Sequence, residues 1–105
     1  PRTFSLEVVS PESIVWSGRA EMVITRTTEG EMGILADHEP TMAALSTGTT
    51  VITAEGGEKT SVAIHGGFLQ ILHNEVTLLT DRAELAEGDV DPSRLAEALA
   101  DAADE

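Results

Sequence analysis

The sequence has no cysteine, a single lysine and only three aromatic residues in 105 positions. Without cysteine there is no disulfide framework, no thiolate nucleophile and no cysteine-ligated zinc. The lysine, Lys59, follows Gly56-Gly57-Glu58 and lacks the Gly-Lys-Ser/Thr ending of a phosphate-binding loop, so a tight turn is predicted there. Three aromatic side chains are too few for a surface on which bases or sugars stack.

Basic residues and long apolar runs are also scarce. Nineteen acidic residues stand against six basic ones, which gives a net charge of −13. Such a surface repels phosphate backbones and anionic lipids, so we expect protein partners with basic patches and no nucleic acid. No apolar run approaches the roughly 20 residues that span a bilayer, and the N-terminus has no signal-peptide pattern. We therefore expect a soluble, cytoplasmic domain without direct membrane insertion.

Apolar and polar side chains alternate over the first eighty residues, as in strands that bury one face. Valine, isoleucine and threonine dominate about nine such segments, and turns rich in glycine separate them. The predicted strands comprise residues 4–8, 14–16, 21–26, 32–35, 42–45, 49–53, 61–65, 68–72 and 76–80. Short strands at this spacing, with no helical period between them, predict an antiparallel sandwich or barrel.

The composition changes after the last predicted strand, and two parts are expected. Residues 1–82 form the β-sandwich domain, and residues 83–105 hold a polar linker and one short α-helix. Asp91 is suited to cap the N-terminus of this helix, and Pro92 to occupy its first turn. A modest apolar stripe of leucine and alanine follows on one face of the helix.

Histidines and carboxylates are the residues that could carry metal or acid–base chemistry. Their densest cluster is Asp37-His38-Glu39, but three consecutive residues rarely point at one ion, so no metal site is predicted. No serine lies in a Gly-x-Ser-x-Gly elbow. A small hydrolase that combines a serine with His38 or His65 across strands is the enzymatic alternative. It would require a concave pocket that contains a histidine.

Residues 27–35 place two glycines and two carboxylates between predicted strands. Gly30 and Gly33 indicate backbone positions that do not accept a β-carbon. Glu29 and Glu31 would then be displayed at a tight, ordered tip. A rigid acidic tip predicts a docking site for a basic partner, and the alternative is a plain surface turn.

Four motifs are spread in order along nearly the whole chain. The first two are Leu6-Glu7-Val8-Val9-Ser10-Pro11-Glu12 with Trp16-Ser17-Gly18, and Gly30-Glu31-Met32-Gly33-Ile34-Leu35-Ala36-Asp37-His38-Glu39-Pro40. The others are Gly66-Gly67-Phe68-Leu69-Gln70-Ile71 with Val76-Thr77-Leu78-Leu79, and Ala83-Glu84 with Val90-Asp91 and Arg94. In this order the motifs resemble the epsilon subunit of F-type (rotary) ATP synthases, of the bacterial type with a shortened C-terminal helical part.

The resemblance implies a mainly β fold, an antiparallel ten-stranded β-sandwich followed by one short C-terminal α-helix. It implies a non-catalytic central-stalk subunit, without a cofactor, that links the gamma subunit to the c-ring and couples rotation to ATP synthesis. Such a subunit would be a peripheral protein at the cytoplasmic face of the bacterial plasma membrane.

The resemblance also assigns residues to two interfaces. The side that faces the c-ring, whose loops carry an arginine in this family, would contain Glu29, Gly30, Glu31 and Met32. The side that faces gamma would present an apolar patch and the region of Ser10, His38 and Met42.

The C-terminal part departs from the family pattern, in which a two-helix hairpin commonly restrains ATP hydrolysis. Only one short, acidic helix is expected here, through which the chain would reach the catalytic beta subunits. The alternative function is an ATP-sensing regulator of hydrolysis, with Asp91 and Arg94 as nucleotide-binding candidates. Leu95 replaces the alanine of the family's ATP-binding motif.

Overall fold

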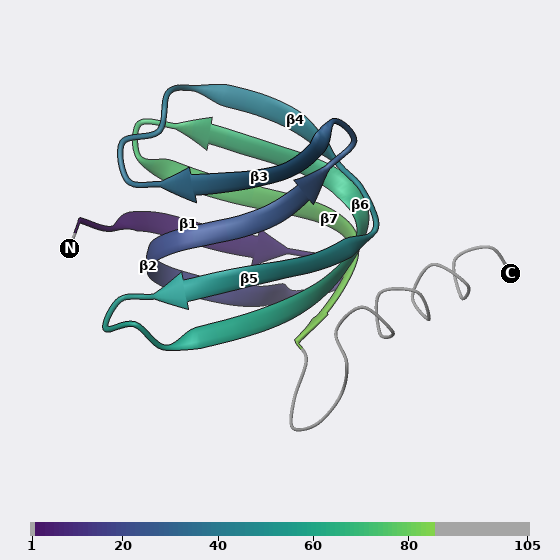
Figure 1. Ribbon diagram of the computed structural model, residues 1–105. Coiled ribbons are helices and arrows are strands. Elements are labelled where there is room, and N and C mark those ends of the chain that lie inside the picture. The colour runs from purple at the N-terminus through teal and green to yellow at the C-terminus, as the bar shows by residue number, and fades with distance from the viewer. Residues whose placement is uncertain (1, 86–105) are drawn as a thin grey trace, which may run out of the picture.

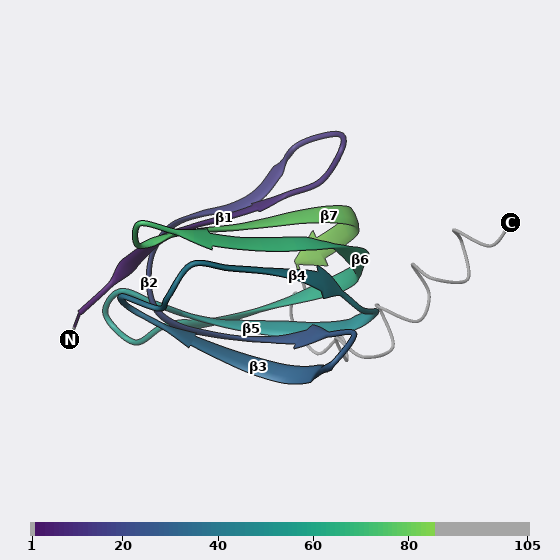
Figure 2. The same cartoon turned by 90° about the horizontal axis from the view of Figure 1, so that it is seen from above.

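The computed structural model describes residues 2–85, which form seven β-strands and contain no helix (Figure 1). The strands pack as two layers around buried apolar side chains (Figure 2). They are β1 (Phe4–Val9), β2 (Ile14–Thr27), β3 (Gly30–Leu35), β4 (Thr41–Leu45), β5 (Gly48–Ala54), β6 (Lys59–Leu72) and β7 (Glu75–Leu85). The prediction of a mainly β, sandwich-type fold is confirmed.

Three long strands bend and contribute a segment to each layer. β2 pairs with β1 through residues 14–20, and then with β3 and β5. β6 pairs with β5 before its bend at Gly66-Gly67 and with β4 after it, while β7 follows β6 across both layers. By these pairings, the first layer holds β1, β4 and one segment each of β2, β6 and β7. The second layer holds β3, β5 and the other segments of the three long strands. Seven continuous strands therefore supply the ten strand segments that the resemblance implies.

The predicted strand breaks and the predicted strand directions need correction. Ser17 and Gly18 do not end a strand, because both pair with β1. Gly66 and Gly67 bend β6 without ending it, since its pairing with β7 has the same register on both sides. The pairing is also not entirely antiparallel: β1 and β7 run parallel, because the chain returns to its first strand only after crossing the whole domain.

The last strand is longer than predicted. β7 extends to Leu85, which pairs with Val62 of β6, so residues 83–85 belong to the sheet and not to a linker. Val62 is fully buried, and pairing along this buried segment extends β7 beyond residue 82. The remainder of the predicted linker and the predicted helix lie outside the described residues.

The most completely buried polar side chains of the described residues are two threonines whose hydroxyls bond each other. Thr25 of β2 and Thr50 of β5 are almost completely buried, and their Oγ1 atoms lie 2.6 Å apart. The largest fully buried side chains around them are Phe4, Leu6, Ile34, Ile52, Ile64, Leu69, Ile71 and Leu78. Each hydroxyl has the other as its hydrogen-bond partner, so burying the two together costs little folding free energy.

Replacing Thr25 with valine is expected to lower the free energy of unfolding by about 1–3 kcal/mol, because it leaves the Thr50 hydroxyl buried without a partner. The double variant Thr25→Val/Thr50→Val, which removes both hydroxyls with little change in shape, is expected to recover most of this loss. Urea denaturation of the unmodified chain, of Thr25→Val, of Thr50→Val and of the double variant measures the coupling. Additive losses in the double variant would show that the two hydroxyls do not depend on each other.

Candidate functional site

The outer face of the first layer carries a row of apolar side chains that crosses all five of its strand segments. Its members follow one another in the pairing register, and the row consists of Ile14, Val9, Leu79, Phe68 and Ala44. Ile14, Phe68 and Leu79 are each at least half exposed. At about 4.8 Å between strands the row is roughly 19 Å long. We call these five residues the apolar row.

Two further apolar side chains widen this surface beside the row. Met42 of β4 is 73% exposed, and Leu72 of β6 is 42% exposed. Both line a shallow depression of about 350 Å³, together with Pro40, Thr41, Gln70 and Ile71. Soluble monomers rarely expose several large apolar side chains side by side, so this surface is the candidate interaction site.

The residues that the resemblance assigns to the gamma side lie around this surface rather than in one cluster. Met42 projects from it. His38 precedes β4, and its Nδ1 lies 2.8 Å from the carbonyl oxygen of Glu39. Ser10 directly follows Val9 but is only 9% exposed, because its hydroxyl bonds the backbone of Ser13. Ser10 thus holds the turn that leads to Ile14 and offers little surface itself.

The sequence analysis missed Ile14, Phe68 and Leu79 as surface residues, although a local signal was present. Apolar residues occur in adjacent pairs in the last two strands, as in Phe68-Leu69 and Leu78-Leu79. Neighbouring residues of a strand point to opposite faces, so such a pair indicates a segment that is apolar on both faces.

The acidic tip is the turn between β2 and β3. Thr28 and Glu29 form this turn, and Gly30 follows with a φ of 122°. The Thr27 hydroxyl fastens the turn, because it accepts a bond from the Glu29 amide at 3.1 Å and donates one to the Gly30 carbonyl at 2.9 Å. The predicted tight tip is confirmed as a hydrogen-bonded turn. The prediction for Gly33 is wrong, because its φ is not positive and an added Cβ would meet nothing within 4 Å, so this position accepts a β-carbon.

The four residues assigned to the c-ring side differ in exposure. Glu29, Gly30 and Glu31 are exposed, whereas Met32 is half-buried and packs against the core. Among the described residues, neither of the two carboxylates at the tip has an ion-pair partner. Their charge is therefore available to a basic partner.

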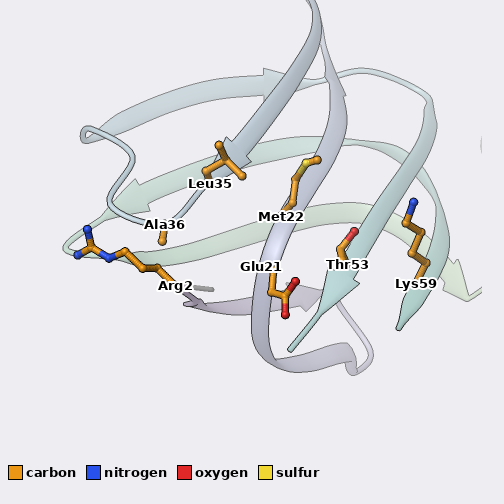
Figure 3. A pocket seen from close by; sticks show the side chains of 7 residues that line it. All are labelled: Arg2, Glu21, Met22, Leu35, Ala36, Thr53 and Lys59. Atoms are coloured by element: carbon orange, nitrogen blue, oxygen red, sulfur yellow. The ribbon is translucent and has the colours of Figure 1, made fainter. Parts of the chain in front are cut away.

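A groove of about 570 Å³ lies on the outer face of the second layer (Figure 3). Met22 and Leu35 form its apolar part, and Arg2 and Lys59 lie on opposite sides of it. It contains neither a histidine nor a serine, and the same is true of the depression beside Met42. These cavities give no support to the histidine-dependent hydrolase.

The Asp37-His38-Glu39 cluster is not arranged around a common point. Asp37 forms an ion pair with Arg2, while the His38 ring faces a backbone carbonyl. Within residues 2–85, no group of three histidine, aspartate or glutamate side chains could hold a metal ion. The nucleotide-binding candidates Asp91 and Arg94 lie outside the described residues. The described part of the chain has no helix able to cross a membrane.

Comparison with known proteins identifies relatives of this sandwich. The family model described as the β-sandwich domain of the ATP synthase delta/epsilon chain matches residues 3–86. The chain is 43% identical over 90 residues to the ATP synthase epsilon chain of Brevibacillus brevis, covering 86% of this chain and 67% of the relative. It is 44% identical over 78 residues to the epsilon chain of Frankia casuarinae, covering 74% of this chain and 92% of the relative.

Solved structures agree with this relationship. A chain in the structure of the Euglena gracilis mitochondrial ATP synthase, which contains OSCP, F1 and the c-ring, superposes with a TM-score of 0.79 at 32% identity. The superposition covers 99% of this chain and 66% of that chain. This chain therefore spans about two thirds of the length of the Euglena chain and of the Brevibacillus relative.

Proposed function

Since the chain belongs to the delta/epsilon chain family of the ATP synthase, we propose that it is a non-catalytic subunit of the central stalk that links the gamma subunit to the c-ring. In this role it binds two neighbours that rotate together and makes or breaks no covalent bond. As part of the synthase it is a peripheral protein, and in a bacterium it acts at the cytoplasmic face of the plasma membrane.

The observation that carries the proposal is the apolar row. A stalk subunit that turns with gamma has to bind gamma permanently, and permanent interfaces have apolar cores. The row supplies such a core, because it crosses five strand segments and three of its members are large and at least half exposed. Met42 extends the same surface, so the row and Met42 together form the gamma-binding face in our proposal.

The acidic tip is the surface proposed for the c-ring. Glu29 and Glu31 are exposed and held on a hydrogen-bonded turn, so they lose little conformational freedom on binding. Carboxylates of this kind steer and orient a basic loop more than they add affinity. We therefore propose that the chain binds gamma through a strong apolar interface and the c-ring through a weaker, salt-sensitive interface.

Replacing both carboxylates of the tip, Glu29→Gln/Glu31→Gln, is expected to weaken retention of the c-ring by the gamma-bound chain about three- to tenfold at low salt. The reason is that exposed charge pairs contribute about 0.2–1 kcal/mol each. Pull-down of the detergent-solubilised c-ring at increasing salt concentration measures the effect, which is expected to vanish at high salt.

The matched control is Glu55→Gln/Glu58→Gln, which removes two exposed carboxylates at the β5–β6 turn, the opposite end of the sandwich (Figure 1). The control variant is expected to retain the ring like the unmodified chain. Equal weakening by both variants would attribute the effect to net charge and not to the tip.

A further inference from the structure

β2 changes its partner near the acidic tip. Its pairing with β5 in the second layer extends to Ile24, which lies opposite Val51. At its last residue, Thr27, the strand pairs instead with Leu45 of β4, which belongs to the first layer. Thr27 and Leu45 are both buried, so solvent does not compete at this crossing. The tip is therefore attached to the layer that carries the apolar row.

Three hydrogen bonds make this attachment. The Thr28 amide donates to the Ala44 carbonyl at 3.0 Å, and the Ser46 amide donates to the Arg26 carbonyl at 3.1 Å. The Ser46 hydroxyl also donates to the Thr27 carbonyl, at 3.4 Å. We call residues 26–28 and 44–46 the tip joint.

Through the tip joint, the acidic tip and the apolar row are connected by backbone hydrogen bonds between residues that adjoin both surfaces. Thr28 is the chain neighbour of Glu29 in the tip, and Ala44 is a member of the apolar row, next to Phe68. Without the joint, the pairing with β5 that supports the β2–β3 hairpin would end at Ile24, about 13 Å back along β2 from Thr28. β2 itself would lead to the first layer only at its bend near residue 20. The joint holds the hairpin at its end, so a sideways force on the tip bends it less.

We infer that the backbone amides of Thr28 and Ser46 position the acidic tip against the apolar row, so that force applied at the tip reaches the partner on the row without bending the β2–β3 hairpin. This inference rests on the proposed function for the identity of the two partners. Thr28 and Ser46 are positioning residues, since neither is required to touch gamma or the ring.

The test is the pair of full-length variants Thr28→Pro and Thr28→Ala. Thr28 is the first residue of the turn and does not have a positive φ, and the fixed φ of proline suits the first central position of the common β-turns. Proline therefore keeps the turn but removes the N–H that bonds Ala44. Alanine removes the same exposed side chain and keeps that N–H, so it is the matched control.

Two readouts are expected to separate the variants. In the isolated chain, hydrogen exchange of the Ser46 amide is expected to be at least tenfold faster in Thr28→Pro and unchanged in Thr28→Ala. In the assembled synthase, protons pumped per ATP hydrolysed are expected to fall at least twofold in Thr28→Pro only. Affinity for isolated gamma is expected to stay within twofold for both variants, because the apolar row is intact.

Equal exchange and equal pumping in the two variants would overturn the inference. If Thr28→Pro does not fold, Ser46→Ala is used in its place. Hydrogen exchange of the Thr28 amide about threefold faster in Ser46→Ala than in the unmodified chain would support the joint, and unchanged exchange would contradict it. The proposed function is tested separately: it would be wrong if the unmodified chain did not bind gamma. In that case the hydrogen-exchange measurement would still decide whether the joint holds the tip.

Discussion

Replacing Phe68 with glutamate is expected to reduce binding of the chain to the gamma subunit at least 100-fold. Phe68 lies inside the apolar row, between Leu79 and Ala44, and 56% of its surface is exposed in the free chain. Aromatic side chains near the centre of an interface commonly contribute 2 kcal/mol or more. Glutamate would lose that contact and also bury an unpaired charge against an apolar partner, which costs more still.

The matched control is Leu35→Glu, which places the same charge on the opposite outer face of the sandwich. Leu35 is 60% exposed, so the two substitutions begin from nearly equal exposure. Both variants are expected to keep the thermal stability of the unmodified chain within a few degrees, because neither site is in the core. Titration calorimetry with gamma measures the affinities. A loss of the same size for Leu35→Glu would show that binding is not confined to the apolar row.

Replacing Gly67 with alanine is expected to lower the free energy of unfolding by at least about 3 kcal/mol, a large fraction of the 5–15 kcal/mol typical of a domain. An added Cβ would lie 2.0 Å from the Leu79 carbonyl oxygen and 2.7 Å from the Thr80 Cα. Both atoms belong to the backbone of β7, which is held in the sheet and cannot move aside. The φ of 125° adds strain for any L-residue.

Gly30→Ala separates the clash from the backbone strain. Gly30 has nearly the same φ, 122°, but an added Cβ would meet nothing within 4 Å. Its replacement is expected to cost only about 1–2 kcal/mol, which is the strain alone. Urea denaturation followed by circular dichroism measures both variants. Equal losses of unfolding free energy in the two variants would mean that the β7 backbone shifts to accommodate the added Cβ, so that β6 does not need a glycine at its bend.

The sequence predicted the fold where the signal is local. Alternation of apolar and polar residues identified the β-rich part of the chain and most of the strand segments. It divided β2 at Ser17-Gly18 and β6 at Gly66-Gly67, because a glycine looks the same in a turn and in a bend of a continuing strand. The bend at Gly66-Gly67 was itself expected, but as the boundary between two strands. Only the partner strand decides between the two. The parallel pairing of β1 with β7 is equally non-local, since it joins the two ends of the described chain.

The acidic tip could be predicted from the sequence and the apolar row could not, because only the tip is formed by neighbours in the chain. The acidic tip was predicted from residues 27–35 alone, because its glycines and carboxylates are neighbours in the chain. The apolar row takes its five members from five different strands, and only the pairing register brings them into line. Of the exposed apolar residues on this surface, only Met42 was anticipated, and that through the family resemblance.

Cysteine cross-linking in the assembled synthase identifies the subunit that each surface contacts. The chain has no cysteine of its own, so Met42→Cys and Glu29→Cys each carry a single reactive thiol, the first beside the apolar row and the second on the tip. Position 42 is expected to cross-link to gamma and position 29 to a c-ring subunit. Cross-links to the opposite partners, or none to either subunit, would show that the two surfaces do not hold these neighbours.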